Sequence, residues 1–96
     1  MTRTAVRDVD DLYDWIADRD GEDAAARVVQ IINAFAEKSA RIGNPGSPCD
    51  RLSSGLRSAH HKGFNFFFLI RGDEMRMIHI VRGARDVRKL DFTETD

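Results

Sequence analysis

The chain has 96 residues, 42% of them hydrophobic and 32% charged, and it carries a net charge of −1. This length and composition predict one soluble domain over residues 1–96. A membrane-spanning helix is excluded, because the longest apolar run, Phe66 to Ile70, is far shorter than the roughly 20 residues that a span needs. The charged stretch from Thr2 to Asp14 is unlike a signal peptide, and the single cysteine, Cys49, has no partner for a disulfide or a metal site. We therefore expect a cytoplasmic protein with no metal and no other cofactor.

The net charge hides an asymmetry along the chain. Residues 1–48 have six Lys/Arg and nine Asp/Glu, whereas residues 51–89 have nine Lys/Arg and three Asp/Glu. A basic second half indicates a surface that meets something negative, which could be a nucleic acid, an acidic protein surface or an acidic peptide. A basic face that contacts only solvent explains the same counts equally well.

The first predicted element is a helix over about residues 5–19. Apolar residues recur there at helical spacing, and acidic residues occupy the opposite side. The apolar residues are Val9, Leu12, Tyr13 and Ile16, and the acidic ones are Asp8, Asp11, Asp14 and Asp18. Thr4 is the expected N-cap, and residues 1–4 are too few for more than an edge strand. Asp20-Gly21 is expected to end the helix.

A second helix is predicted over about residues 22–41. Arg41 suits the negative end of the helix dipole, and Gly43 follows as a stop signal. The break at Asp20-Gly21 is so short that the two helices should form an antiparallel hairpin over residues 5–41. The residues expected to be buried are Ala25, Val28, Val29, Ile32, Phe35 and Ala36.

Strands are predicted for the second half, over about residues 51–90. Residues 44–48, NPGSP, indicate a loop, a strand is expected within residues 51–60, and a turn at residues 61–63. Before and after a turn at Gly72-Asp73, successive residues alternate between two faces of a strand, which predicts a β-hairpin. In its second strand one face is expected to carry Ile78, Ile80 and Arg82, and the other Met77, His79 and Val81.

The first strand of this hairpin, from Phe64, is apolar on both faces, so it should be central and covered on each side. Residues 84–90 are expected to form a short helix or a final strand. Two helices followed by three or four antiparallel strands define an α+β fold, with the helical hairpin packed on one face of the sheet. The other face would be the natural partner surface.

The same residues also resemble a known family. The resemblance rests on several segments in order: Ala5, DLYDWIA at residues 11–17, Gly21, Ala24 and Ala25, GLRS at 55–58, FFFLI at 66–70 and IHIVRGARD at 78–86. In this order and spacing, over about residues 5–90, they resemble the ParE toxins of the RelE/ParE superfamily. The chain departs from the family in two ways: few residues precede Ala5 for the family's first strand, and Phe68-Leu69 stand where a Tyr is usual.

The resemblance implies a β-α-α-β-β-β toxin of a bacterial type II toxin–antitoxin module, encoded beside a ParD-like antitoxin. Toxins of this family inhibit DNA gyrase and are not enzymes themselves, and the antitoxin's tail folds onto the toxin. The resemblance further implies that the toxin has no membrane partner and does not bind nucleic acid in a sequence-specific way.

A ribosome-dependent ribonuclease of the RelE kind is the main alternative, and a family member that only binds its antitoxin is a third. RNA cleavage needs a base for the 2′-OH, an acid for the leaving oxygen and cations on the phosphate. The candidates for these roles are Arg57, His60, His61, Arg82 and Arg85. The two adjacent histidines titrate near neutral pH, but exposed histidines are common in a turn such as the one expected here. His79, on a strand, is expected to be packed in the core or in an interface.

Contacts with the antitoxin or the target are expected from one aromatic and several charged residues: Trp15, Arg57, Arg82, Arg85, Asp86 and Arg88. Arginine forms bidentate bonds with carboxylates and phosphates, so this set fits an acidic partner. A structural role explains Arg85-Asp86 as well, by bridging the sheet to a helix or capping residues 84–90. Trp15 projects from a different side of its helix than Leu12, so that it either covers the sheet edge or anchors the antitoxin tail. Cys49 is expected to be an unreactive thiol.

Overall fold

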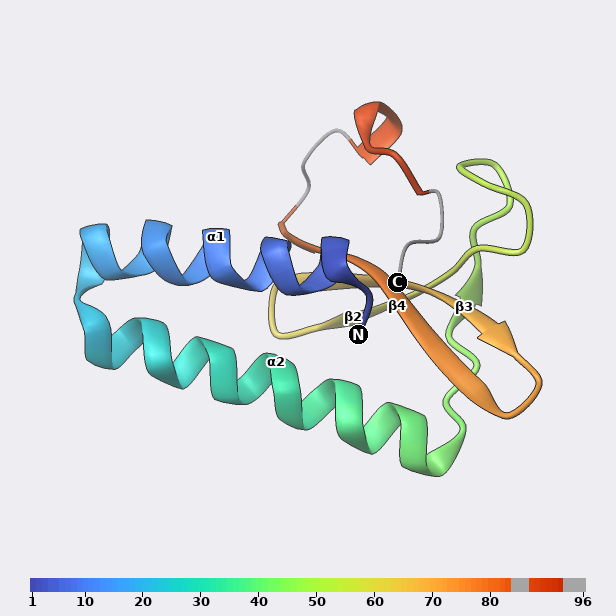
Figure 1. Cartoon of the computed structure of the whole chain (residues 1–96), viewed down its shortest axis with the longest axis horizontal. Helices are drawn as coiled ribbons and strands as arrows, with labels where there is room; N and C mark the ends of the chain where they lie inside the picture. Colours follow the sequence, from blue (N-terminus) through green and yellow to red (C-terminus); the bar gives the residue numbers. More distant parts are fainter. Residues whose placement is uncertain (84–86, 93–96) are drawn as a thin grey trace.

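The computed structural model describes residues 1–83 and 87–92, in which two antiparallel helices cover one face of a four-stranded antiparallel sheet (Figure 1). The helices are α1, Arg3–Asp20, and α2, Glu22–Ile42. The strands lie in the order β1 (Ser47–Pro48), β2 (Arg57–His61), β3 (Phe64–Arg71) and β4 (Glu74–Arg82), and a short 3-10 helix, η1, spans Val87–Lys89. The predicted α+β class and the helical hairpin are confirmed.

The start of α1 is fastened to the sheet and lies earlier than predicted. Thr2, not Thr4, is the N-cap, because its hydroxyl accepts a hydrogen bond from the Ala5 N–H at 3.2 Å. The Thr2 backbone N–H and hydroxyl both donate to the carbonyl oxygen of Met77 in β4, at 3.1 and 2.7 Å. The predicted edge strand over residues 1–4 is wrong, since the chain turns into the helix directly after this contact.

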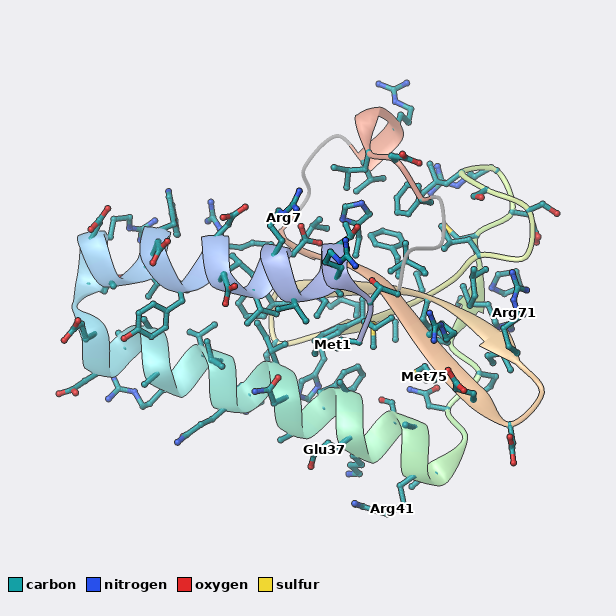
Figure 2. All side chains as sticks on the ribbon, in the orientation of Figure 1. Met1, Arg7, Glu37, Arg41, Arg71 and Met75 are labelled. Carbon is teal, nitrogen blue, oxygen red and sulfur yellow. The ribbon has the colours of Figure 1, made fainter. Side chains whose placement is uncertain are left out.

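Glycines end both helices, as predicted. Gly21 has φ 95° and Gly43 has φ 70°, backbone conformations that other residues rarely adopt. Between them α2 turns its predicted apolar stripe, including Ile32, toward the sheet. Figure 2 shows Glu37 and Arg41 projecting from α2 away from the sheet, so that this helix is amphipathic in the expected sense. Among the described residues, no helix is both long and apolar enough to cross a membrane.

The first two strands differ from the prediction. Residues 44–48, expected to be loop, contain β1, in which Ser47 and Pro48 pair with Ser58 and Arg57. Residues 51–55, expected to be strand, form turns and bends. The turn after β2 consists of Lys62 and Gly63, which both have positive φ, and this is the conformation that a tight hairpin requires. His60 and His61 therefore belong to β2 and not to the turn.

A register shift interrupts the pairing of β3 with β4. Phe67 pairs with His79 and Phe68 with Met77, so that Ile78 has no residue opposite it, as in a β-bulge. The strict alternation predicted for β4 is wrong for this reason. Met77 and Ile80 pack on the helices, whereas Ile78 and Val81 pack on the other side of the sheet.

Both faces of β3 are covered, as predicted. The helix-facing cluster of buried residues consists of Ala5, Val9, Ile32, Phe64, Phe66, Phe68, Met77 and Ile80. The far-face cluster consists of Cys49, Leu56, Phe67, Leu69, Ile78, Val81 and Phe92, with Leu52, Val87 and Leu90 packed around them.

The far face is therefore covered by the chain itself and is not the open partner surface that the sequence led us to expect. Residues 49–56 and the C-terminal segment, residues 87–92, lie over it (Figure 1). In the last predicted element, residues 84–86 lie outside the described residues, and the part that follows is the 3-10 helix η1 and not a strand.

Candidate functional site

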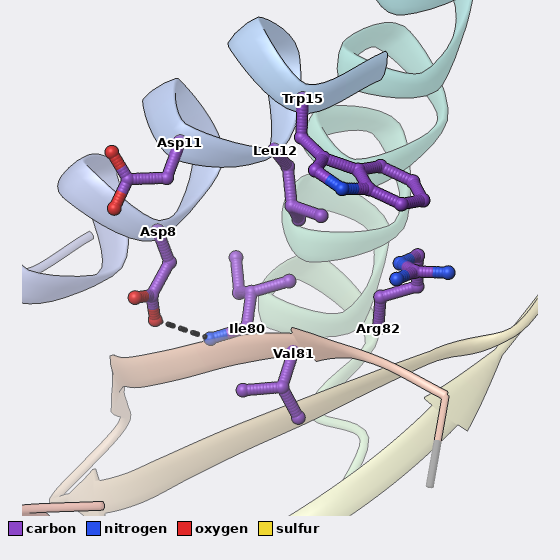
Figure 3. Close-up of a pocket in the computed structure, with 7 residues that line it drawn as sticks. All are labelled: Asp8, Asp11, Leu12, Trp15, Ile80, Val81 and Arg82. Atoms are coloured by element: carbon purple, nitrogen blue, oxygen red, sulfur yellow. Dashed lines mark hydrogen bonds between the residues drawn. The ribbon is translucent and has the colours of Figure 1, made fainter. Parts of the chain in front are cut away.

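A groove of about 330 Å³ runs between α1 and β4 (Figure 3). Because β4 is the edge strand of the sheet, one side of its backbone has no neighbouring strand in the part of the chain that the structure describes. The residues that line the groove are Asp8, Asp11, Leu12 and Trp15 of α1 and Ile80, Val81 and Arg82 of β4. The groove therefore combines an apolar floor with carboxylates near one end and a cation at the other.

Trp15 and Arg82 form the basic end of the groove. The guanidinium carbon of Arg82 lies 3.8 Å from the centre of the Trp15 ring, and that of Arg19 lies 4.2 Å from it. Cation–π contacts of this kind hold the indole in place while leaving it 39% exposed. Two residues that the sequence analysis selected separately are thus in direct contact.

Asp8 forms the acidic end, and its position differs from the prediction. The sequence pattern put it on the solvent side of its helix, but its Oδ2 accepts hydrogen bonds from the Ile80 N–H at 3.0 Å and from Nδ1 of His79 at 2.7 Å. The Asp8 side chain is 21% exposed. By accepting the Ile80 N–H, Asp8 satisfies one donor of the open sheet edge and joins α1 to β4.

Asp8, Asp11 and Ile80 were not predicted as site residues from the sequence. A signal for the helical part was present, because residues 8, 11, 12, 15 and 19 follow the helical i, i+3/i+4 spacing and form one stripe along α1. That stripe mixes acidic, aliphatic, aromatic and basic residues, so it does not stand out as apolar or polar. The prediction that Trp15 projects from a different side of its helix than Leu12 is wrong, because both side chains line the groove. Ile80 belongs to the site because its strand is at the edge of the sheet. The order of the strands decides which strand is at the edge, and the local sequence around Ile80 does not reveal that order.

The other selected residues that the structure describes do not line the groove. Arg57 donates from Nε to the carbonyl oxygen of Pro45, and Nδ1 of His60 lies 3.0 Å from Oδ1 of Asn65. The His61 ring stacks on Phe35 of α2, with ring centres 4.3 Å apart. Arg88, in η1, is exposed. Arg85 and Asp86 lie outside the described residues.

The two adjacent histidines point to opposite faces of the sheet. His61 pairs with Phe64, a member of the helix-facing cluster, and Phe64 pairs on its other side with Arg82. His61 and Arg82 therefore share a face but are separated by β3, about 10 Å apart across two strand spacings. His60 pairs with Asn65 and faces the other way. Within the described residues, the ribonuclease candidates are thus not gathered around one point.

His79 is buried, with 6% of its surface exposed, in agreement with the prediction of a packed histidine. Besides Asp8, its ring contacts the carbonyl oxygen of Asp91, 2.7 Å from Nε2, and the edge of the Phe92 ring. The hydrogen bond to Asp8 raises the pKa of His79, against the opposing effect of burial, and Asp91 raises it further. The ring does not line the groove, but it bonds Asp8, which does.

A small two-helix domain whose antiparallel sheet keeps one edge groove open has the form of a protein-binding module. A family model described as the ParE toxin of the type II toxin–antitoxin system parDE matches residues 1–87. Among solved structures, the chain is similar to one from the chromosomal ParDE toxin–antitoxin system of P. aeruginosa, with 26% sequence identity and a TM-score of 0.74. That match covers 86% of this chain and 91% of the other. No curated protein matches the chain.

The chain belongs to the ParE toxin family, and it is a ParE-type toxin of a toxin–antitoxin system.

Proposed function

We propose that this toxin inhibits DNA gyrase and is neutralised by a ParD-like antitoxin whose tail binds in the groove between α1 and β4. Family membership supports both the target and the kind of antitoxin. The observation that carries the antitoxin site is the Trp15–Arg82 contact beside the open edge of the sheet. An exposed aromatic ring held rigidly at a sheet edge is the type of residue that dominates the binding energy of protein interfaces.

The charges of the groove define the tail that fits it. Arg82 and Arg19 around the indole suit a carboxylate, which arginine binds with two parallel hydrogen bonds. Asp11, exposed near the opposite end, suits a lysine or arginine. Leu12, partly exposed between them, suits an aliphatic side chain. We therefore expect a tail segment with an acidic, an aliphatic and a basic residue in succession, ordered only when bound.

The function is tested by supercoiling assays with purified gyrase, with linear plasmid as the sign of trapped cleavage. We expect inhibition or linear DNA when the toxin is added, and recovery when the protein encoded by the adjacent gene is added first. Unchanged supercoiling together with cut mRNA in a translation extract would assign the toxin to the RelE-like ribonucleases. No effect in either assay would leave a protein that only binds its antitoxin.

The geometry supports the gyrase proposal over the ribonuclease. An acid and a base that act on one phosphate must face the same point, and His60 and His61 face opposite sides of the sheet. We expect growth inhibition in cells to persist in a variant with His60→Gln and His61→Gln together. Loss of toxicity in this variant, with the fold intact by circular dichroism, would count against the gyrase proposal.

A further inference from the structure

His79 connects three parts of the fold that are far apart in the sequence. The ring belongs to β4, Asp8 belongs to α1, and Asp91 belongs to the C-terminal segment. The next residue, Phe92, packs its ring against His79 and Phe67, with ring centres 5.3 and 5.1 Å away, and is itself 7% exposed. The hydrogen bond from His79 to the Asp91 carbonyl oxygen is therefore made by the residue adjacent to Phe92, whose ring is part of the far-face cluster.

The hydrogen-bond partners of His79 require a proton on each ring nitrogen. Nδ1 faces a carboxylate oxygen of Asp8 and Nε2 faces a backbone carbonyl oxygen, both at 2.7 Å. Neither oxygen can donate a hydrogen bond, and the same Asp8 oxygen already accepts one from the Ile80 N–H. Only an imidazolium, with two N–H groups, donates to both.

We propose that His79 is a protonation-dependent clasp that holds the C-terminal segment, residues 87–92, over the far face of the sheet. The neutral ring has a single N–H, and it keeps that proton toward Asp8 because an ionised acceptor forms the stronger hydrogen bond. The lone pair on Nε2 then faces the lone pairs of the Asp91 carbonyl oxygen, so the contact that fixed the segment becomes repulsive. The segment detaches, and Phe67, which is 4% exposed in the closed form, becomes accessible.

The direction of the pH dependence follows from the groups that surround the ring. Asp8 from α1 and Asp91 from the C-terminal segment are the charged groups that act on His79, while β3 presents the apolar ring of Phe67. Both carboxylates favour the charged imidazolium, so the pKa of His79 is raised. The clasp is therefore closed below the ordinary histidine pKa and opens as the pH rises through the raised pKa of His79.

The full-length chain without substitutions provides the first test. Ring-nitrogen NMR shifts from about pH 6 to about pH 9 report the protonation state of each histidine. Cys49, in the far-face cluster and 7% exposed, reports opening through its rate of reaction with a disulfide reagent. Dividing the rate in the urea-unfolded chain by that in the folded chain at each pH removes the effect of thiolate formation and gives a protection factor.

We expect both nitrogens of His79 to be protonated at about pH 6, and the protection of Cys49 to fall with the same midpoint as the His79 titration. The nuclear Overhauser contact between the Phe67 and Phe92 rings should disappear over the same range. A His79 ring with only one proton at about pH 6 would overturn the proposal. So would a protection factor that stays constant while His79 titrates.

Two substitutions separate a clasp from a merely structural histidine. Asp8→Asn keeps an oxygen for the Ile80 N–H but removes the charge, so both midpoints should move together to lower pH. His60→Gln alters a histidine of the same sheet that bonds Asn65 and does not contact the segment, and both midpoints should stay unchanged. Unmoved midpoints in Asp8→Asn, or a shift in His60→Gln, would contradict the proposal.

Discussion

Trp15 is the residue whose removal should weaken antitoxin binding most clearly. Its ring is 39% exposed between α1 and β4 and lies against Arg82, so it offers a large rigid surface that need not be ordered on binding. We expect Trp15→Ala to cost about 2 kcal/mol of binding free energy, a loss of roughly 30-fold in affinity, measured by calorimetry with the protein encoded by the adjacent gene.

Val6→Ala is the control for this substitution. Val6 is in the same helix and 47% exposed, but it does not line the groove, so its loss should change the affinity by less than about twofold. Equal affinities for the unsubstituted toxin and Trp15→Ala would show that the antitoxin binds to another surface.

Asp8 is expected to contribute more to stability than the other acidic residue of the groove. Asp8→Ala leaves the buried His79 charge without its carboxylate and the Ile80 N–H without its acceptor. We expect it to lower the free energy of unfolding by about 2–4 kcal/mol, measured by urea denaturation at about pH 6, where His79 is charged. Asp11→Ala, an exposed acid one turn along the same helix, should change it by less than about 0.5 kcal/mol. Similar losses in the two variants would mean that the Asp8 contacts do not stabilise the fold.

The elements most accurately predicted from the sequence are those whose limits depend on local chemistry. Gly21 and Gly43 end the helices because only glycine easily takes their backbone angles, and β3 is recognisable because aromatic residues occupy both of its faces. The start of α1 was misplaced because Thr2 is selected as N-cap partly by Met77, far along the chain. The bulge in β4 likewise arises from pairing with Phe67 and Phe68. No local pattern encodes such distant contacts.

The candidate site was predicted only in part for the same reason. Trp15 and Arg82 were selected from the sequence as individual residues, but their contact depends on how α1 lies against β4. Asp8 was predicted to face solvent because helical spacing shows only which residues lie on the same side of the helix. It does not show that this side packs against β4, where Asp8 accepts the Ile80 N–H.

The short strand β1 depends on a glycine at position 46. A Cβ added to Gly46 would lie 2.5 Å from the Ser58 carbonyl oxygen and 2.8 Å from the Phe68 ring, and φ is 60°. Gly43 has a similar φ of 70° but open space around it, so Gly43→Ala measures the backbone strain alone. We expect Gly46→Ala to destabilise the protein by about 1–3 kcal/mol more than Gly43→Ala in urea denaturation, because of the added steric overlap. Equal losses would show that β1 and β2 move apart at little cost.

The stability of the whole molecule should depend on pH through His79. Its pKa in the folded state is raised above the ordinary value of 6.5, so the contribution of its ion pair is fully present below that value and is lost as the pH rises through the folded-state pKa. We expect the free energy of unfolding to decrease, as the pH rises through that folded-state pKa, by at most about 1.4 kcal/mol per pH unit.

The measurement is urea denaturation at a series of pH values, with His79→Gln as the comparison. Glutamine does not titrate, so the decrease should be smaller in this variant. The same slope in both proteins would assign the pH dependence to other groups.

The two apolar clusters are completed at different times when the chain is synthesised. Every residue of the helix-facing cluster has been added once the ribosome reaches Ile80, whereas the far-face cluster still lacks its members Val81 and Phe92 and the neighbouring Val87 and Leu90. A chain that is released at that point has a sheet with one apolar face partly uncovered, which is a surface that chaperones and proteases recognise. An mRNA cleaved between the codons for Ile80 and Phe92 would therefore yield a chain that is degraded, and not a smaller toxin.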